Sequence, residues 1–403
     1  MSQAFASVLI IGGGLAGIES ALSLRRLGWR GAVTIVNAEI ELPYDRPPLS
    51  KGVLLGKTDV ARICLRPAEL YAELDINILA DRRAVSLDVQ RRRLMLSDGL
   101  ELEYHALIFA TGATPRKLQV PGSALRGVVT LRTLSDSLEL KSSLVAGTQL
   151  TVAGGGYLGL EVAAAAAQMG VHVTVIEAGH RLLQRSGSQS LSRIVATRLE
   201  QAGVVINLEE SVSCFRGGTR LEAVETSRGR KIETDIALVA IGAVPNDELA
   251  RKAGLSGSGG IQVDGQAQTA AQNIYAVGDC ANFWDSRFGC HARLESVQSA
   301  TWQARTAAAA ITGTSLPKLR HAYFWSELFD LKIQIAGFAD PAMSSHDELV
   351  GSDAEGFVIY RFQRGKLAAV ECVNRPADYV KAQLLIGRAA ENLTDLKDAK
   401  LES

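Results

Sequence analysis

The chain has 403 residues, which is long for a single hydrophobic core and suits two or three domains. Its 43 Lys and Arg residues equal its 43 Asp and Glu residues, so no overall charge attracts nucleic acid or an anionic membrane. It has no basic signal-peptide start and no run of about 18 apolar residues, so we expect no membrane-spanning helix. The sequence therefore predicts a globular protein, most simply cytoplasmic, without a nucleic-acid or membrane partner.

The five cysteines are too scattered for a metal site or a disulfide relay. None forms a C-x-x-C pair, and no group of them has the spacing of zinc ligands. An odd number of cysteines without a framework fits free thiols in a reducing compartment. We therefore expect no metal and no redox-active disulfide from these residues, which are Cys64, Cys214, Cys280, Cys290 and Cys372.

Two segments of the chain predict the same βαβ unit. In the first, the apolar run "SVLII" ends at Gly12, a helix is expected over residues 18–27, and "GAVTIVNAE" supplies the next strand. In the second, "QLTVAG" precedes a helix expected over residues 157–169 and the strand "VHVTVIEAG". Such units are parts of a doubly wound nucleotide-binding fold.

The similarity between the two halves extends beyond these units. The first half continues with the proline-stiffened loop "PYDRPPLSKG", a hairpin with an Asp98-Gly99 turn, and the buried strand of "ALIFATGATP". The second continues with a hairpin region over residues 211–234 and the strand of "IALVAIGAVPN". One type of domain therefore occurs twice. The arginines at 82–83 and 91–93 are either a local basic patch or, more simply, a solvated hairpin edge.

The rest of the chain completes the first domain and adds a third. "AGLSGSGGIQVD" predicts a surface turn and a short strand, "NIYAVGDCANF" a buried strand, and residues 296–311 a long helix. From about residue 316, strands and the terminal helix of "PADYVKAQLLIGRA" indicate an α+β domain. We predict an α/β fold of two Rossmann-like dinucleotide-binding domains plus this domain, with boundaries at 1–115 and 246–314, 116–245, and 316–403.

Each βαβ unit carries a phosphate-binding glycine sequence. The first glycine makes the tight turn, the second admits the pyrophosphate, and the third lets helix and strand pack closely. The pyrophosphate then lies at the helix N-terminus, where free N–H groups favour negative charge. A single copy is weak evidence, but two copies, each between a strand and a helix, indicate two dinucleotide sites, at Gly12, Gly14 and Gly17 and at Gly154, Gly156 and Gly159.

The acid that follows the next strand distinguishes the two sites. Glu177 follows "VTVI", where its carboxylate can accept both adenine-ribose hydroxyls and repel a 2′-phosphate, although Arg181 lies nearby. We therefore expect NADH rather than NADPH at the second site. In the first unit Asn37 aligns with Glu177, and Glu39 is the candidate for the ribose contact, with a solvated turn residue as the alternative.

The motifs "YDRPPLSK", "ATG", "GGGYLGLEVA", "AIGAVPN" and "AVGDC" resemble the FAD-containing pyridine-nucleotide reductases of the glutathione-reductase structural class. More narrowly, essentially the whole chain resembles the NADH-dependent ferredoxin reductases that serve bacterial Rieske oxygenases and cytochromes P450. The resemblance implies FAD on the first glycine loop and NADH on the second. The implied FAD contacts are Gly12, Gly14, Ala16, Gly17, Glu39, Arg46, Lys51, Ala84, Thr111, Gly112, Arg132, Gly278, Asp279, Val297 and Trp325, and the implied NADH contacts are Gly154, Gly156, Tyr157, Leu158, Gly159, Glu161, Glu177 and Gly242.

Three of these residues are the catalytic candidates that the resemblance implies. Lys51 is similar to the lysine beside flavin N5, where a cation stabilises the reduced flavin. Glu161 is similar to the glutamate that pairs with this lysine and meets the nicotinamide amide, and Trp325 to an aromatic at the far edge of the flavin. The alternatives are a surface lysine and a core or interface tryptophan.

Further roles are implied for residues around the flavin. Asp279 matches the aspartate that binds the ribityl chain, and Arg132 the arginine that reaches the FAD phosphates. Ala84 and Val297 match positions that touch FAD through the backbone. Glu295 matches a residue near the flavin ring, although a structural role is nearly as plausible.

The chain departs from the family pattern in two places. It has Asn37-Ala38 where the family usually has Gly-Asp, which leaves the FAD ribose contact open. It also lacks the cysteines that many members carry after the first helix: Ser50 offers no thiol, Cys64 lies too far along, and Cys280 is most simply a packing residue.

Without a thiol relay, electrons must leave the flavin directly, so the resemblance implies an NADH:ferredoxin oxidoreductase with a [2Fe–2S] ferredoxin as acceptor. We expect a transient, electrostatic complex near the C-terminal domain, with Arg293 as a candidate contact, and a monomer or a dimer. The alternatives are a rubredoxin reductase, an NADH oxidase or peroxidase, and an apoptosis-inducing-factor-like redox-sensing flavoprotein.

Overall fold

The computed structural model describes residues 6–285, 290–318, 323–340, 343–352 and 354–398. The chain forms two compact units, each made of three stretches. Unit 1 contains Met1–Asp45, Val60–Thr114 and Ala243–Arg320, and unit 2 contains Arg46–Asp59, Pro115–Gly242 and His321–Ser403. The predicted three-domain boundaries stay a prediction. In the described part of the chain, no helix is long and apolar enough to cross a membrane.

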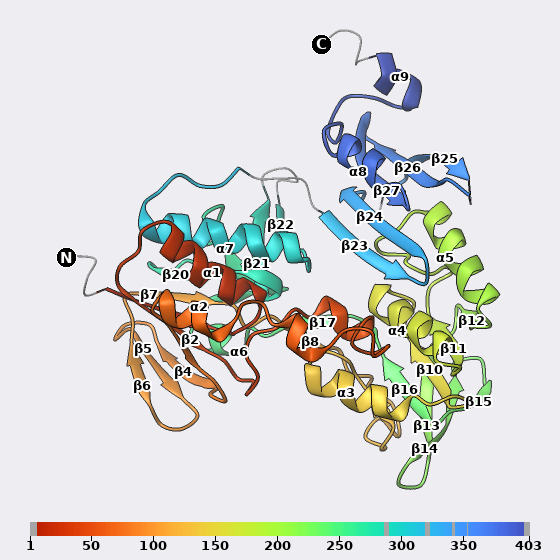
Figure 1. Ribbon diagram of the computed structural model, residues 1–403, viewed down its shortest axis with the longest axis horizontal. Helices are drawn as coiled ribbons and strands as arrows, with labels where there is room; N and C mark the ends of the chain where they lie inside the picture. Colours follow the sequence, from red (N-terminus) through yellow and green to blue (C-terminus); the bar gives the residue numbers. More distant parts are fainter. Residues whose placement is uncertain (1–5, 286–289, 319–322, 341–342, 353, 399–403) are drawn as a thin grey trace. The chain divides into compact units, whose positions relative to one another are not determined.

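A parallel sheet with the strand order β20-β7-β1-β2-β3 is the core of unit 1 (Figure 1). All four residues of the central strand β7 are buried, as expected in a parallel sheet, and all three residues of the edge strand β20 are buried as well. Helices α1 (Leu15–Arg26) and α7 (Val297–Thr312) pack against each other. The strands are β1 (Ser7–Ile11), β2 (Ala32–Val36), β3 (Ile76–Leu79), β7 (Ala106–Phe109) and β20 (Ile274–Ala276).

Smaller elements complete unit 1. Two further sheets have the orders β4-β5-β6 and β18-β19-β21-β22. The remaining elements are η3 (Val60–Ile63), α2 (Ala68–Glu73), β4 (Ala84–Asp88), β5 (Arg93–Leu96), β6 (Glu101–Glu103), α6 (Glu248–Lys252), β18 (Ser256–Gly257), β19 (Gly260–Val263), η4 (Gly278–Cys280), β21 (Ala281–Asp285) and β22 (Cys290–Ala292). The short strands β8 (Ala113–Pro115) and β17 (Ala243–Pro245) pair where the chain passes from one unit to the other.

Unit 2 contains a second parallel sheet, with the order β12-β11-β10-β16-β9. Helix α4 (Tyr157–Gln168) follows β10 and contacts β10, β11, the turn η2 (Pro47–Ser50) and the strand β23 (Tyr323–Leu328). The other elements of this half are β9 (Val128–Val129), α3 (Leu134–Ser143), β10 (Gln149–Ala153), β11 (His172–Glu177), α5 (Gln189–Gln201), β12 (Val205–Leu208), β13 (Val212–Gly217), β14 (Leu221–Thr226), β15 (Lys231–Glu233) and β16 (Ile236–Val239).

An antiparallel sheet with the order β23-β24-β27-β26-β25 forms the C-terminal part of unit 2. Helix α8 (Pro376–Gln383) packs on β24 and β27, and α4 contacts β23, as Figure 1 shows. This arrangement brings the end of η2, one face of α4 and one face of β23 together. The other elements are β24 (Leu331–Gly337), β25 (His346–Ser352), β26 (Gly356–Gln363), β27 (Lys366–Val373) and α9 (Leu393–Asp398).

The predicted hairpin with an Asp98-Gly99 turn is confirmed, because β5 and β6 pair in antiparallel fashion and Gly99 has a φ of +84°. Three of the arginines are paired with acids: Arg82 with Asp98 at 2.6 Å, Arg91 with Asp88 at 3.9 Å, and Arg93 with Glu101 at 2.7 Å and with a second glutamate. The hairpin is therefore a charge-balanced solvated surface and not a basic patch.

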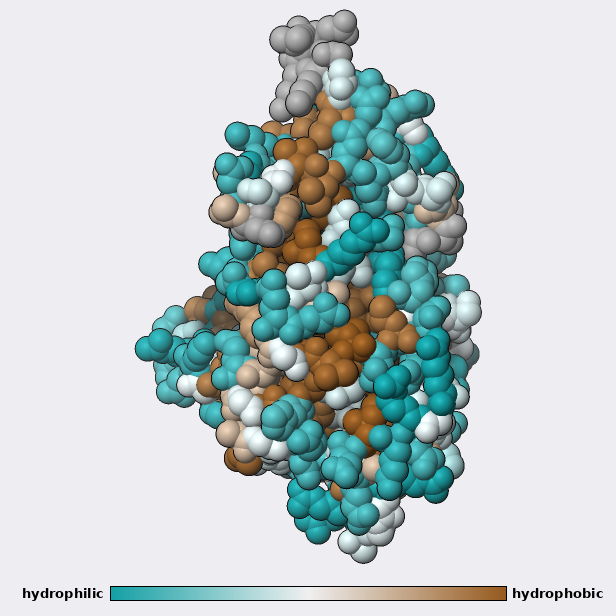
Figure 2. All heavy atoms as spheres, turned by 90° about the vertical axis from the view of Figure 1, so that its right-hand side faces the viewer, coloured by the Kyte–Doolittle hydropathy of each residue, from teal (hydrophilic) through white to brown (hydrophobic). Residues whose placement is uncertain are grey.

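The edges of the unit 2 sheets carry exposed hydrophobic side chains. Figure 2 views the side of α5 and β12 and shows hydrophobic atoms gathered in a band between hydrophilic flanks. Val205 on the edge strand β12 and Val350 on the edge strand β25 are both exposed. The central strands are covered, and β10 has four of its five residues buried.

Candidate dinucleotide and redox site

The two glycine loops have the same backbone geometry. The first glycines, Gly12 and Gly154, have φ values of +118° and +114°, which only glycine adopts readily. A Cβ on Gly17 would lie 2.0 Å from the carbonyl oxygen of Gly12, and a Cβ on Gly159 would lie 2.4 Å from that of Gly154. The strand and the following helix thus approach each other closely in both copies, as predicted.

The middle glycine of each fingerprint faces open space. A Cβ on Gly14 or on Gly156 would meet no atom within 4 Å. Each of these residues is the N-cap of its helix, α1 or α4, and has no side chain that hydrogen-bonds to the first turn. The free N–H groups and the room above them fit a pyrophosphate in both loops. The residues present therefore fit two dinucleotides.

Glu177 ends β11 and is held against the second loop. Its Oε2 accepts a hydrogen bond of 2.6 Å from the Gly155 N–H, and its Oε1 one of 2.7 Å from the Gly179 N–H. A carboxylate has about four acceptor positions, so two remain for the hydroxyls of a ribose. The backbone donors fix the carboxylate where the sequence predicts the adenine-ribose contact.

The Arg181 side chain forms its hydrogen bonds within its own loop. Its guanidinium donates to the carbonyl oxygens of Gly187 at 2.9 Å and Gln184 at 3.0 Å. Burial lowers the pKa of Arg181, and its neighbour Arg361 lowers it further. Because these donors are used, the nearby arginine gives no ready contact for a 2′-phosphate, which supports the expected preference for NADH.

Asn37 occupies the equivalent place in the first unit. A Cβ on Gly13 would lie 2.6 Å from the Asn37 Oδ1, just as one on Gly155 would lie 3.0 Å from the Glu177 Oε2. The Asn37 amide donates to the carbonyl oxygens of Glu39 at 2.8 Å and Glu41 at 3.2 Å. Asn37 therefore shapes the loop that carries Glu39, which is a structural role that the sequence did not predict.

Glu39 lies on that loop with a partner of its own. The Tyr44 hydroxyl donates a short hydrogen bond to the Glu39 Oε2. The carboxylate is partly buried and is therefore more than a solvated turn residue. The assignment of Glu39 to the FAD ribose stays a prediction.

Unit 1 brings several predicted FAD contacts together. A Cβ on Gly278, whose φ is +76°, would lie 2.9 Å from the Cβ of Ala16, so η4 meets the start of α1. The buried Gln303 of α7 accepts a 2.7 Å hydrogen bond from the Gly278 N–H and positions this turn. Thr111 donates to the Asn246 carbonyl at 2.6 Å. The other predicted contacts of unit 1 are Gly112, Ala84, Asp279 and Val297, of which Val297 begins α7.

The remaining predicted FAD contacts belong to unit 2. The Arg46 guanidinium donates to the Arg132 carbonyl at 2.6 Å, so these two residues are neighbours.

Two further predicted NADH contacts are Gly242 and Leu158. Gly242 has a φ of +102°, and a Cβ there would lie 3.3 Å from the Arg185 Nη2. Arg185 was not among the predicted contacts. Leu158 is exposed beside Tyr157 at the start of α4.

Lys51 and Glu161 form an ion pair of 2.7 Å, as predicted. The Lys51 side chain is only 18% exposed and that of Glu161 7% exposed, so the alternative of an ordinary surface lysine is wrong. Two residues that the sequence reasoning missed also bind Glu161. The Ser50 hydroxyl donates to Oε2 at 2.5 Å, and the Ser326 hydroxyl donates to Oε1 at 2.7 Å.

Trp325 is half-buried on β23, next to Ser326. Its ring stacks on Tyr323 with the centroids 5.5 Å apart. Successive residues of a strand face opposite sides, so Trp325 and Tyr323 share one face and Ser326 lies on the other. Its role beside the flavin stays a prediction.

Arg293 and Glu295 contact each other in a short ion pair. The Arg293 guanidinium also donates to the Asp279 carbonyl at 3.4 Å, and its side chain is only 22% exposed. This arginine holds the chain beside Asp279 and presents little charge to a partner. For Glu295, the contact favours the structural role that the sequence left open.

Four cysteines in the described part of the chain carry free thiols: Cys64, Cys214, Cys280 and Cys372. Cys64 is exposed and the other three are buried. Burial raises the pKa of the Cys280 thiol, and raises that of Cys372 to about 12. The interpretation of Cys280 as a buried packing residue is confirmed, since it is fully enclosed.

Alkylation should therefore modify Cys64 and leave the flavin chemistry intact. At about pH 8 a thiol with a pKa near 12 is almost entirely protonated, so Cys372 should react at least 100-fold more slowly than Cys64, and the buried Cys280, whose pKa is also raised, should react more slowly than Cys64 too. Peptide mapping after iodoacetamide treatment measures the three rates. Loss of electron transfer in Cys64→Ser would contradict a thiol-independent reaction, whereas loss on alkylation alone would show only that the added group interferes.

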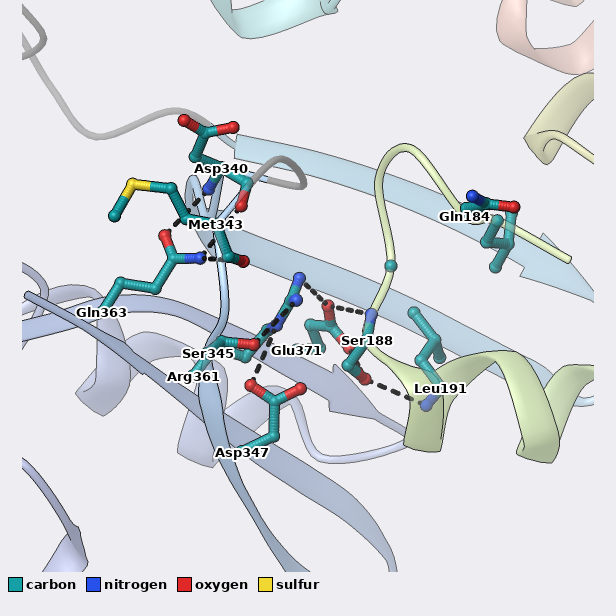
Figure 3. Close-up of polar contacts among 12 residues, drawn as sticks. Gln184, Ser188, Leu191, Asp340, Met343, Ser345, Asp347, Arg361, Gln363 and Glu371 are labelled. Carbon is teal, nitrogen blue, oxygen red and sulfur yellow. Dashed lines mark hydrogen bonds and ion pairs between the residues drawn. The ribbon is translucent and has the colours of Figure 1, made fainter. Parts of the chain in front are cut away.

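A second buried carboxylate binds the C-terminal sheet to α5 (Figure 3). Glu371 on β27 is fully buried, and its Oε2 accepts a 2.5 Å hydrogen bond from the hydroxyl of Ser188, the N-cap of α5. Arg361 approaches Glu371 to 3.2 Å and Asp347 to 3.3 Å. Burial raises the pKa of Glu371, and Arg361 opposes this effect. A cavity of about 280 Å³ lies beside Arg361 and Asp347.

The comparisons with known proteins match most of the chain. Residues 6–304 match the family model "Pyridine nucleotide-disulphide oxidoreductase", and residues 323–401 match "Reductase C-terminal". The chain is 37% identical over 374 residues to the rubredoxin-NAD(+) reductase of Pseudomonas putida, covering 92% of this chain and 96% of that protein. It is 38% identical over 393 residues to the chlorobenzene dioxygenase ferredoxin reductase component of Cupriavidus sp. (strain PS12), covering 97% and 95%.

A solved structure is similar over nearly the full length. The ferredoxin reductase for the CYP199A2 system from Rhodopseudomonas palustris superimposes with a TM-score of 0.92 at 37% identity. The match covers 98% of this chain and 99% of that one. It confirms the predicted fold class.

Proposed function

The chain belongs to the pyridine nucleotide-disulphide oxidoreductase family, and we propose that it is an NADH-dependent ferredoxin reductase of an oxygenase or cytochrome P450 system. It carries FAD and uses NADH. The observation that carries the proposal is the pair of equivalent glycine loops together with the buried Lys51–Glu161 ion pair. A rubredoxin is the alternative acceptor, because a relative of similar identity is named for one.

FAD, when bound, supplies the conversion of a two-electron hydride transfer from NADH into two one-electron transfers. The residues of the chain bind FAD and NADH and orient them toward each other. The loop at Gly12–Gly17 holds the FAD pyrophosphate at the start of α1, and the loop at Gly154–Gly159 holds that of NADH at the start of α4. Glu177 accepts the adenine-ribose hydroxyls.

Lys51 and Glu161 act at the reacting end of the nucleotide. Lys51 places a fixed positive charge beside the flavin, which favours the electron-rich form. Glu161 holds the lysine and accepts a hydrogen bond from the nicotinamide carboxamide. We expect a thiol-independent reaction: burial raises the pKa of the Cys280 and Cys372 thiols, and the exposed Cys64 is the thiol that the alkylation experiment tests. Free thiols also fit the cytoplasm, where we place the protein.

A basic cluster on unit 1 is the docking surface that we propose for an acidic ferredoxin. Arg26, Arg66 and Arg305 surround the buried Glu19, with nitrogen–oxygen distances of 3.8, 3.4 and 3.9 Å. Their side chains are 53%, 40% and 53% exposed. Three guanidinium groups against one carboxylate leave these four side chains with a net charge of +2. It replaces Arg293 as the candidate, since that guanidinium is held by Glu295.

Neutralising two of these arginines should slow ferredoxin reduction without affecting the flavin site. For Arg66→Gln/Arg305→Gln we expect the second-order rate constant for ferredoxin to fall about tenfold at low salt and to depend less on salt. Reduction of ferricyanide by NADH, which needs no protein docking, should be unchanged.

The matched control is Arg91→Gln/Arg92→Gln, which removes two exposed arginines from the unit 1 hairpin. It should leave both reactions as in the wild type. Equal losses in the two double variants would show that overall charge alone matters, and would contradict docking on the Glu19 cluster.

A further inference from the structure

The Glu161 carboxylate has a nearly complete set of hydrogen-bond donors. Oε2 accepts from the Lys51 ammonium at 2.7 Å and from the Ser50 hydroxyl at 2.5 Å. Oε1 accepts from the Ser326 hydroxyl at 2.7 Å. A carboxylate oxygen accepts about two hydrogen bonds, so the position that remains is on Oε1. A bound nicotinamide carboxamide would therefore share this oxygen with Ser326.

Ser326 is held rigidly in place by the C-terminal sheet. It is fully buried on β23, which pairs with β24 along its whole length. On the same face, Phe324 lies against Tyr157 of α4, with ring centroids 4.4 Å apart. The strand therefore contacts α4 at two points one turn apart on the helix, and the hydroxyl has little freedom to leave Glu161.

The two serines differ in what their loss would change. Ser50 and Lys51 both donate to the Glu161 Oε2, so the ion pair with Lys51 still fixes this oxygen when the Ser50 hydroxyl is removed. Ser326 provides the one protein contact to Oε1 among the described residues, and nothing else orients that oxygen. Without it the carboxylate can rotate about the Oε2 contacts, and the free acceptor position moves with it.

We propose that Ser326 is a positioning residue for nicotinamide recognition: its hydroxyl orients the Glu161 Oε1 so that the remaining acceptor position faces the carboxamide. The C-terminal sheet thus contributes to the NADH site through one hydrogen bond. This inference rests on the proposed function, because it assumes that NADH binds with its nicotinamide at Glu161.

The test compares two ligands that differ in the nicotinamide. Calorimetry on the FAD-loaded protein measures the Kd of NAD⁺ and of ADP-ribose, which lacks that ring. For Ser326→Ala we expect NAD⁺ binding to weaken about tenfold, while ADP-ribose binding stays within about twofold of the wild type. Ser326→Thr, which keeps the hydroxyl, should restore NAD⁺ binding. Ser326→Cys keeps the volume with a weak donor and should show the same selective loss as alanine.

Ser188→Ala is the matched control. The hydroxyl of Ser188, the N-cap of α5, also donates to a buried carboxylate, that of Glu371 on β27, at 2.5 Å (Figure 3), and it is not one of the two serine hydroxyls that bind Glu161. For Ser188→Ala we expect a lower Tm and unchanged affinity for both ligands.

A second measurement on Ser326→Ala follows the Lys51–Glu161 ion pair. The amine of Lys51 should remain paired with Glu161 in this variant, so its rate of acetylation should change less than about twofold.

Two results would overturn the proposal. One is wild-type NAD⁺ affinity in Ser326→Ala, and the other is an equal loss for NAD⁺ and ADP-ribose, which would indicate general damage to the site. If the wild type binds neither ligand, the proposed function itself fails, and the two failures are therefore distinguishable.

Discussion

Lys51→Met should slow flavin reduction by NADH about 100-fold or more at saturating NADH, while FAD stays bound. The substitution removes the charge that the buried pair presents and leaves the 7% exposed Glu161 carboxylate with only two serine hydroxyls. Removing one partner of a buried ion pair strongly destabilises the folded protein, because the remaining charge stays buried without a partner. Stopped-flow measurement of flavin bleaching gives the rate directly.

Two variants separate charge from packing. Lys57→Met changes an exposed lysine six residues further along the same loop and should have no effect. Lys51→Met/Glu161→Gln removes both charges, so it should recover the thermal stability lost in the single variant but not the rate. A single variant that reduces its flavin as fast as the wild type would show that Lys51 does not act on the flavin.

Glu177→Ala should lower kcat/KM for NADH about 100-fold and reduce the preference for NADH over NADPH. The carboxylate is fixed by the N–H groups of Gly155 and Gly179, so both ribose hydroxyl contacts are lost at once. The repulsion of a 2′-phosphate disappears with the charge. Because Arg181 is bound to loop carbonyls, we expect no large gain in absolute NADPH activity.

Steady-state kinetics with both nucleotides measures this change. Glu200→Gln on the exposed face of α5 is the control and should behave as the wild type. A variant that loses NADH and NADPH activity by the same factor would contradict a role in discrimination. Retention of full NADH activity would contradict the ribose contact.

The elements that a local sequence pattern determines were predicted well. The glycine turns need positive φ and close backbone approach, which the sequence spacing encodes directly, and the structure has both loops as expected. The helix after the second loop begins at Tyr157 as predicted. Asn37 aligned correctly with Glu177, because both follow equivalent parallel strands.

The contacts that depend on distant segments were not predicted. Ser50 and Ser326 are 111 and 165 residues from Glu161 in sequence, and nothing in their local pattern indicates that they share a carboxylate. Glu371 is likewise a buried polar residue whose partner, Ser188, lies 183 residues away in sequence. Helix α5 was missed because its pattern is interrupted by polar residues on the buried side, Ser192 among them. Predicting such contacts requires knowledge of the three-dimensional fold.

The central claim is electron transfer from NADH through FAD to a small iron–sulfur protein. Stopped-flow mixing of the NADH-reduced protein with an excess of oxidised [2Fe–2S] ferredoxin, with rubredoxin in a parallel series, tests it most directly. We predict that ferredoxin reoxidises the flavin faster than dissolved oxygen does, with two ferredoxins reduced per NADH. If neither acceptor reoxidises the flavin faster than oxygen, the proposed function is contradicted.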